Sequence, residues 1–298
     1  MAGKREKKRN NLPLPGVLLV LAVLAAVLST GGPRGVAVNS PAETLEPEVT
    51  PVVETAEGSA DSEAGPEEME EDWAGPVPES PLVQDTYFDD VVFLGDSRTD
   101  GLRLYSGLQN GTFLCSTGAT VESVFNKSVE TAVGEMPLLD ALAMLDCGKI
   151  YIMLGINELG WNGTETFRTQ SAALIRRIQA DHPEAEIVIQ SILPVSAEKD
   201  DEGRYVNNGR IDQYNQVWMD LAEELDAAYL NVAEGVAGED GQLPSDLCYD
   251  GVHLNKAGCR LWLDYLRTHA VGDIQDVIAP AAVETEAPAE PVLPVAAN

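Results

Sequence analysis

Short apolar runs rich in β-branched residues alternate with longer amphipathic stretches between residues 89 and 270 of this 298-residue chain. This alternation is typical of a parallel sheet whose strands are joined by helices on its faces. The third run is continuously apolar, as expected for a strand buried on both sides. The sequence therefore predicts an α/β domain with a central parallel sheet of about five strands. The expected strands lie within residues 90–97, 111–115, 149–155, 185–193 and 227–232.

Helices are expected where apolar residues recur at a spacing of three and four positions between these runs. Residues 164–180 and 211–225 have this pattern. A closing helix is expected over residues 255–270, with the side chain of Asn255 as its N-cap.

The two ends of the chain have compositions that do not build a core. Residues 1–11 are basic and precede an apolar run at 12–29, so the basic end is expected to stay in the cytoplasm while the rest is exported. The run is long enough either for a single transmembrane anchor or for a cleaved signal segment. Residues 30–84 are predicted to be a disordered acidic linker and 277–298 a disordered tail. The folded domain is then expected at 85–276, outside the cytoplasm in either case.

The formal net charge of −30 narrows the range of partners. Nucleic acids, anionic lipid surfaces and polyphosphate substrates favour clustered Lys and Arg, whereas the acidic excess here persists within the folded part. Neutral or cationic polymers are the expected partners, and contact with a membrane is expected through the N-terminal segment only. Nothing in the sequence indicates a metal, an organic cofactor or an oligomeric state.

Four cysteines, at positions 115, 147, 248 and 259, are candidates for disulfides if the domain is exported. They allow three full pairings, and a bond between Cys248 and Cys259 would close the loop between them. The alternative is that the thiols pack as small buried hydrophobic groups. The spacing of the cysteines and histidines gives no convincing zinc site.

Two short segments carry the groups that acyl transfer by a serine requires. Ser97 follows the first apolar run in "VVFLGDSRTDGL", and Asp250 and His253 stand three residues apart in "YDGVHLNKAG". A serine hydroxyl becomes a nucleophile when an imidazole takes its proton and a carboxylate holds the imidazole. His253 is the best candidate base because His182 and His269 have no partner motif. A serine after a strand can instead cap the next helix, and an aspartate before glycine can be a turn residue.

The candidate residues fall at one edge of the predicted sheet. Parallel α/β sheets gather functional residues where strands end and loops pass to helices. Ser97 follows the first strand, Gly118 follows the second, and Asn157 follows the third. His253 precedes the last helix, so the fold is expected to bring all four to the same place.

Four sequence blocks resemble, in order and spacing, those of the SGNH (GDSL-type) hydrolase family. The blocks are "GDS" at 95–97, the glycine of "STGAT" at 118, "GINE" at 155–158 and "DGVH" at 250–253. The resemblance implies a three-layer αβα (flavodoxin-like) fold and a serine esterase that forms an acyl-enzyme. It implies that Ser97 is the nucleophile, His253 the base and Asp250 the triad acid. The oxyanion hole would comprise the backbone N–H groups of Ser97 and Gly118 and the side-chain amide of Asn157.

The chain departs from the family pattern beside these residues. Glu158 stands where the family most often has aspartate, and its extra methylene puts the hydrogen bonds of that loop in question. Arg98 and Thr99 stand where the family name has leucine, and Arg98 is expected to be solvated at the start of a helix, although it could contact substrate. Asp96 is expected to point away from the serine and to hydrogen-bond within its loop.

The leading hypothesis is an extracytoplasmic serine esterase that removes O-acetyl or other short acyl groups from a glycan or a small ester. A lysophospholipase or thioesterase would apply the same chemistry to longer acyl chains. An O-acetyltransferase would pass the acyl group to a sugar hydroxyl in place of water. An inactive surface binding module is the alternative from another class, and the retention of every reacting group speaks against it.

Overall fold

The computed structural model describes residues 75–280. The predicted basic end, the apolar segment at 12–29, most of the acidic linker and most of the tail lie outside the described residues. Between residues 75 and 280, no helix combines the length and the apolar character needed to cross a membrane.

A five-stranded parallel sheet forms the centre of the domain, with the strand order β2-β1-β5-β6-β7. Each strand lies inside a run where the sequence predicts one. The strands are β1 (Val91–Gly95), β2 (Thr112–Cys115), β5 (Lys149–Met153), β6 (Glu186–Gln190) and β7 (Ala228–Leu230). This order is that of flavodoxin-like doubly wound sheets, so the predicted fold class is confirmed.

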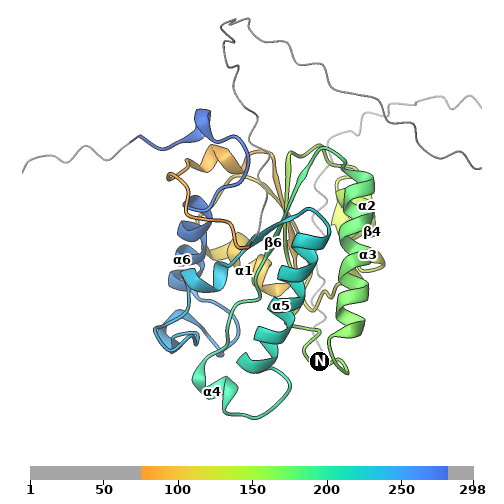
Figure 1. Cartoon of the computed structure of the whole chain (residues 1–298). Coiled ribbons are helices and arrows are strands. Elements are labelled where there is room, and N and C mark those ends of the chain that lie inside the picture. Colours follow the sequence, from red (N-terminus) through yellow and green to blue (C-terminus); the bar gives the residue numbers. More distant parts are fainter. Residues whose placement is uncertain (1–74, 281–298) are drawn as a thin grey trace, which may run out of the picture. The chain divides into compact units, whose positions relative to one another are not determined.

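Helices cover both faces of the sheet and complete the three layers (Figure 1). The α-helices are α1 (Ser97–Tyr105), α2 (Leu138–Leu142), α3 (Glu165–Asp181), α4 (Ala197–Asp200), α5 (Asn208–Glu224) and α6 (Lys256–Arg267). Helices α2, α3 and α5 pack on one face, and α1 and α6 pack on the other. Short 3-10 helices are η1 (Asp85–Phe88), η2 (Ser123–Phe125), η3 (Val232–Gly235), η4 (Ser245–Leu247) and η5 (Gln275–Val277).

The core consists of two apolar layers, one on each face of the sheet. Because successive side chains of a strand point to opposite faces, each strand contributes to both layers. Leu94 of β1 and Ile152 of β5 pack towards α3 and α5, while Phe93 and Tyr151 pack towards α6. All four side chains are fully buried. The sheet is therefore held rigidly from both sides, which fixes the positions of the loops at its edges.

The three predicted helices are present with small shifts of their ends. α3 begins one residue later than expected, and α5 begins three residues earlier because the side chain of Asn207 caps it by accepting from the Arg210 N–H. Asn255 caps α6 as predicted, accepting from the N–H groups of Ala257 and Gly258.

An antiparallel hairpin, β3 (Ser128–Thr131) and β4 (Gly134–Pro137), was not predicted from the sequence. Its strands are short and half exposed, so they lack the apolar run that marks a buried strand. The turn residues Ala132 and Val133 also lack the Asn-Gly type of signal that favours tight hairpins.

All four cysteines are free thiols. Cys259 is fully buried in the layer between α6 and the sheet, where it packs as a small hydrophobic side chain. Cys115, Cys147 and Cys248 are half-buried. Cys248 and Cys259 therefore do not staple the loop that carries Asp250 and His253.

Residues 75–84, which the sequence assigns to the linker, pack against the domain. The N–H of Val77 donates to a carbonyl of β7, and Val83 forms an antiparallel bridge with Ile278. The side chains of Val77 and Val83 are 3% and 2% exposed. The segment that leads into the domain therefore lies beside the segment that follows α6 at its C-terminal end.

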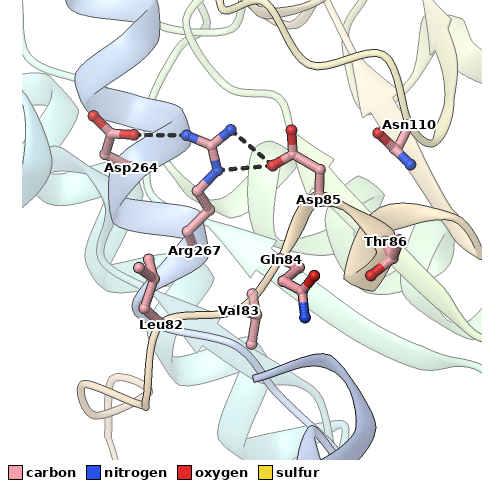
Figure 2. Close-up of a pocket in the computed structure, with 8 residues that line it drawn as sticks. All are labelled: Leu82, Val83, Gln84, Asp85, Thr86, Asn110, Asp264 and Arg267. Carbon is pink, nitrogen blue, oxygen red and sulfur yellow. Dashed lines mark hydrogen bonds and ion pairs between the residues drawn. The ribbon is translucent and has the colours of Figure 1, made fainter. Parts of the chain in front are cut away.

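A hollow of about 580 Å³ lies where residues 82–86 meet the end of α6 (Figure 2). In it, the guanidinium of Arg267 donates to Asp85 at 2.7 Å and to Asp264 at 2.8 Å. Arg267 is the last residue of α6, whereas His253 precedes the first, so the two are separated by the helix length of about 18 Å. This hollow contains none of the candidate catalytic residues, and its ion pair between Arg267 and Asp85 joins α6 to η1.

Candidate active site

The chain turns sharply between the end of β1 and the start of α1, and only glycine fits at the turn. A Cβ on Gly95 would lie 2.0 Å from the Oγ1 of Thr99 and 2.7 Å from the carbonyl oxygen of Met153 in β5. Neither approach is possible for a side chain at this position. The missing Cβ lets Thr99 pack directly against the strand end, and the next residues enter the helix at once.

Asp96 is the N-cap of α1. Its backbone is extended, and its Oδ1 accepts from the N–H of Arg98 at 2.8 Å. Its side chain is fully buried and also accepts from the amide of Asn157, as expected for a residue that braces the loop. Ser97 is consequently the first helical residue and not the cap, so its hydroxyl is available for another partner.

Three side chains form a continuous hydrogen-bonded relay. The Oγ of Ser97 lies 3.0 Å from the Nε2 of His253, and the Nδ1 of His253 lies 2.8 Å from the Oδ2 of Asp250. The Oδ1 of Asp250 accepts from the backbone N–H groups of Val252 and His253, at 3.0 Å and 2.8 Å. The fold thus brings together a hydroxyl, a base and a carboxylate in the arrangement that nucleophilic catalysis by serine requires.

The carboxylate of Asp250 is suited to holding a charged imidazole. Partial burial on its own would raise the pKa of Asp250, but hydrogen bonds from the backbone and ring of His253 and from the Val252 N–H outweigh this effect and lower the pKa. Asp250 therefore stays ionised in neutral solution, which is the form that stabilises a protonated imidazole.

The two backbone groups predicted to hold an oxyanion belong to Ser97 and Gly118, in the segments that follow β1 and β2. Gly118 has a φ of +71°, in the left-handed region that favours glycine, within a turn closed by a bond from the Ala119 N–H to the Ser116 carbonyl. Its own N–H donates to no group within residues 75–280. The N–H of Ser97 lies in the first turn of α1, where helix geometry leaves N–H groups without an internal acceptor.

The side-chain amide of Asn157 is beside these donors but is already engaged. Its Nδ2 donates to the Ala119 carbonyl at 2.9 Å and to the Oδ2 of Asp96 at 3.2 Å. The amide therefore joins the loop after β5 to the loops after β1 and β2. To serve an oxyanion, it would have to share or exchange one of these bonds, and that role stays a prediction.

Glu158 ties two of the functional loops together. Its side chain is fully buried, and its Oε1 accepts from the N–H of Val121 at 2.7 Å. This bond connects the loop that carries Asn157 with the loop that carries Gly118. Burial raises the pKa of Glu158 to about 8, and the charge of Asp96 adds to the effect. The residue that replaces the family's aspartate is thus a neutral bridge at pH 7.

Arg98 is buried, and the prediction that it is solvated is wrong. Its side chain is 3% exposed and its Nη1 donates to the carbonyl of Leu193 at 2.6 Å. Burial lowers the pKa of Arg98 to about 10, opposed by the charges of Asp96 and Asp250. The charges of these two carboxylates partly offset the cost of burying the cation, while its Nε and Nη2 find no hydrogen-bond partner within the described residues. Asp250 is distant in sequence, so the sequence around Arg98 contains no sign of its influence.

The other two histidines have structural partners. The ring of His182 bonds to the carbonyl of Leu142, and His269 stacks on Tyr265 with the ring centres 3.7 Å apart. Neither ring belongs to the relay. The described residues also contain no cluster of His, Cys, Asp or Glu that could hold a metal ion.

A hollow of about 210 Å³ opens beside Ser97 and His253. It is lined by Ser97, Arg98, Asp100, Gly101, Leu104, Tyr105, Tyr249, His253 and Leu254. Tyr105 and Tyr249, both in its lining, contact each other edge to face, with ring centres 6.1 Å apart. Sequence reasoning missed both tyrosines. The only signal was the position of Tyr249 directly before the Asp250 block.

The sequence matches the model of the GDSL-like lipase/acylhydrolase family over residues 93–261. The chain belongs to this family. It is accordingly a serine ester hydrolase, and the match begins in β1 and ends within α6, so it includes every block of the site. No curated protein matches the sequence.

Solved structures with a similar fold include a candidate platelet activating factor from Streptococcus pneumonia, with 25% identity and a TM-score of 0.48, covering 60% of this chain and 82% of that one. An acetyl xylan esterase, AlAXEase, has 17% identity and a TM-score of 0.45, covering 59% and 96%. A GDSL-like lipase from Bacteroides thetaiotaomicron VPI-5482 has 17% identity and a TM-score of 0.45, covering 61% and 85%.

The buried carboxyl of Glu158 predicts a specific pH dependence of stability. Between about pH 4.5 and pH 8, the unfolded chain releases this proton while the folded chain keeps it, so stability falls as the pH rises. Glu158→Gln has no titrating group at this position, so its stability lacks this decrease. The free energy of unfolding of Glu158→Gln minus that of the native chain should therefore increase with pH across this window, by up to about 1.4 kcal/mol per pH unit. Urea unfolding of both proteins at several pH values measures the difference, and a difference independent of pH would contradict the assignment.

Proposed function

We propose that this protein is an extracytoplasmic esterase that uses Ser97 to remove O-acetyl or other short acyl groups from a glycan or a small ester. The observation that supports the proposal best is the relay from Ser97 through His253 to Asp250, with a distance of 3.0 Å at its reacting end. The membership of the chain in a family of lipases and acylhydrolases gives the reaction class.

In the first step, the Oγ of Ser97 attacks the carbonyl carbon of the ester while the Nε2 of His253 takes the hydroxyl proton. The carbonyl oxygen becomes an oxyanion, which accepts hydrogen bonds from the N–H groups of Ser97 and Gly118. Asn157 is proposed as the third donor once its amide turns from the Asp96 carboxylate. Each such donor contributes about 10²- to 10³-fold to the rate.

The tetrahedral intermediate then breaks its bond to the leaving alcohol, which receives the proton from His253. Ser97 is left as an acyl ester. In the second half, His253 takes a proton from water, the resulting hydroxide attacks the acyl carbon, and the carboxylic acid leaves as Ser97 regains its proton. Asp250 keeps the imidazole oriented and stabilises its charged form throughout.

The openness of the site supports a substrate presented on a larger molecule. The side chains of His253 and Asp250 are 44% and 54% exposed, so the relay lies at the surface of the domain. An ester on a polymer can reach such a site without being enclosed. The acidic excess of the chain favours a neutral glycan over an anionic lipid surface as the carrier.

The extracytoplasmic location is proposed from the basic end and the apolar run at 12–29, which lie outside the described residues. In cell fractionation, the protein should be recovered with the membranes. Protease added to intact cells should then digest the domain while the cells stay closed. Recovery from the medium would favour a cleaved signal. Protection of the domain until the cells are lysed would contradict export.

Ser97→Ala should reduce hydrolysis of p-nitrophenyl acetate by at least about 10⁴-fold, because removal of the nucleophile leaves the relay without a function. Ser128→Ala, in the exposed hairpin strand β3, is the matched control and should keep the native rate. Steady-state rates with equal amounts of folded protein make the comparison. Survival of the native rate in Ser97→Ala would show that another group is the nucleophile.

A further inference from the structure

The hollow beside the relay is lined both by reacting groups and by large exposed side chains. Ser97 and His253 line it together with Leu104, Tyr105 and Tyr249. These last three side chains are 52%, 40% and 66% exposed, which is unusual for large apolar groups gathered at one place. Exposed aromatic side chains that line a hollow are typical of a ligand-binding surface.

The position of the hollow relative to the reacting atoms decides which half of an ester it receives. Gly118 and Asn157, the groups proposed to hold the oxyanion, are not among its lining residues, whereas His253 is. The leaving oxygen must come within hydrogen-bond distance of the Nε2 of His253, because that atom returns the proton to it. The alcohol half of the ester therefore extends over His253 and into this hollow.

The chemistry of the walls indicates the kind of alcohol. Tyrosine rings present a flat apolar face with a negative quadrupole, which attracts the C–H groups on the face of a sugar ring, and their hydroxyls can bond to sugar hydroxyls. At about 210 Å³, the hollow is smaller than the roughly 300–1,000 Å³ of sites for drug-sized ligands and suits a single ring.

Asp100 also lines the hollow and offers a polar contact. Its Oδ1 accepts from the Nε and Nη2 of Arg103, at 2.9 Å and 2.7 Å, so its charge is paired. Its Oδ2 makes no hydrogen bond within the described part of the chain and can accept one from a sugar hydroxyl. The paired charge makes a quaternary ammonium group a poorer match than a neutral polyol, although tyrosines can bind either.

We propose that Tyr105 and Tyr249 form the leaving-group subsite of this enzyme and that its occupant is the sugar ring that carries the ester. This inference rests on the proposed function, since it concerns the same acyl transfer at Ser97. The bond from the acyl carbon to the sugar oxygen breaks as the Ser97 ester forms, the sugar takes the proton from His253, and water then enters through the vacated subsite.

The test compares two acetates that form the same acetyl-enzyme, 6-O-acetylglucose and ethyl acetate. Because the acyl half is identical, the ratio of their kcat/KM values reports the contacts of the alcohol half. In Tyr105→Ala and Tyr249→Ala this ratio should fall about tenfold, the loss expected for one aromatic contact. Tyr205→Ala, which removes an exposed tyrosine that does not line the hollow, is the control and should keep the native ratio.

The outcomes separate the subsite from the function itself. An unchanged ratio in both tyrosine variants would overturn the subsite, and so would a changed preference for acyl length at a fixed alcohol, since that places the acyl chain in the hollow. If the tyrosine variants lose more activity on acetylcholine than on its neutral isostere 3,3-dimethylbutyl acetate, the hollow is a cation site and the sugar subsite is overturned.

If the native enzyme hydrolyses none of these esters, the proposed function fails. The subsite is then still tested by NMR titration of 6-O-acetylglucose into Ser97→Ala, where adding Tyr249→Ala should weaken binding about tenfold.

Discussion

The hydrogen bond between the Oγ of Ser97 and the Nε2 of His253 joins residues that are 156 positions apart in the chain. The sheet makes this possible, because parallel strands deliver their following loops to the same edge. Gly95 lets the chain enter α1 directly from β1, and Asn255 starts α6 two residues after the histidine. Rigid packing on both faces of the sheet holds the two loops at the required separation.

Beneath this bond lies a small set of buried polar groups that a stable core would otherwise avoid. The charges of Asp96 and Asp250 act on the buried Arg98, and Asp96 also accepts a hydrogen bond from the amide of Asn157. Burial raises the pKa of Asp96 to about 6, although the Arg98 backbone N–H and charge act to lower it. Such groups are costly to bury unless they are paired. Their presence under the nucleophile is consistent with a fold that gives up some stability to hold its loops in a single arrangement.

The sheet and the relay were largely predictable from the sequence, because each depends on local signals. The apolar run of β5 and the cap at Asn255 lie in the chain as short patterns, and both appear in the structure where they were expected. The site was harder where it depends on packing between distant segments. The buried Arg98 donates to the carbonyl of Leu193, 95 positions away, and the contact of Tyr105 with Tyr249 depends on α1 meeting the loop before α6. No local sequence pattern indicates either contact.

The central claim is that His253 activates Ser97, and a fluorophosphonate probe tests it most directly. Such a probe forms a stable bond only with a nucleophilic serine, so mass spectrometry of the labelled protein identifies the activated residue. If the relay operates as described, the native protein gains one adduct on the peptide that contains Ser97, and His253→Ala loses it. An adduct on a different residue, or equal labelling of Ser97 in His253→Ala, would contradict the claim.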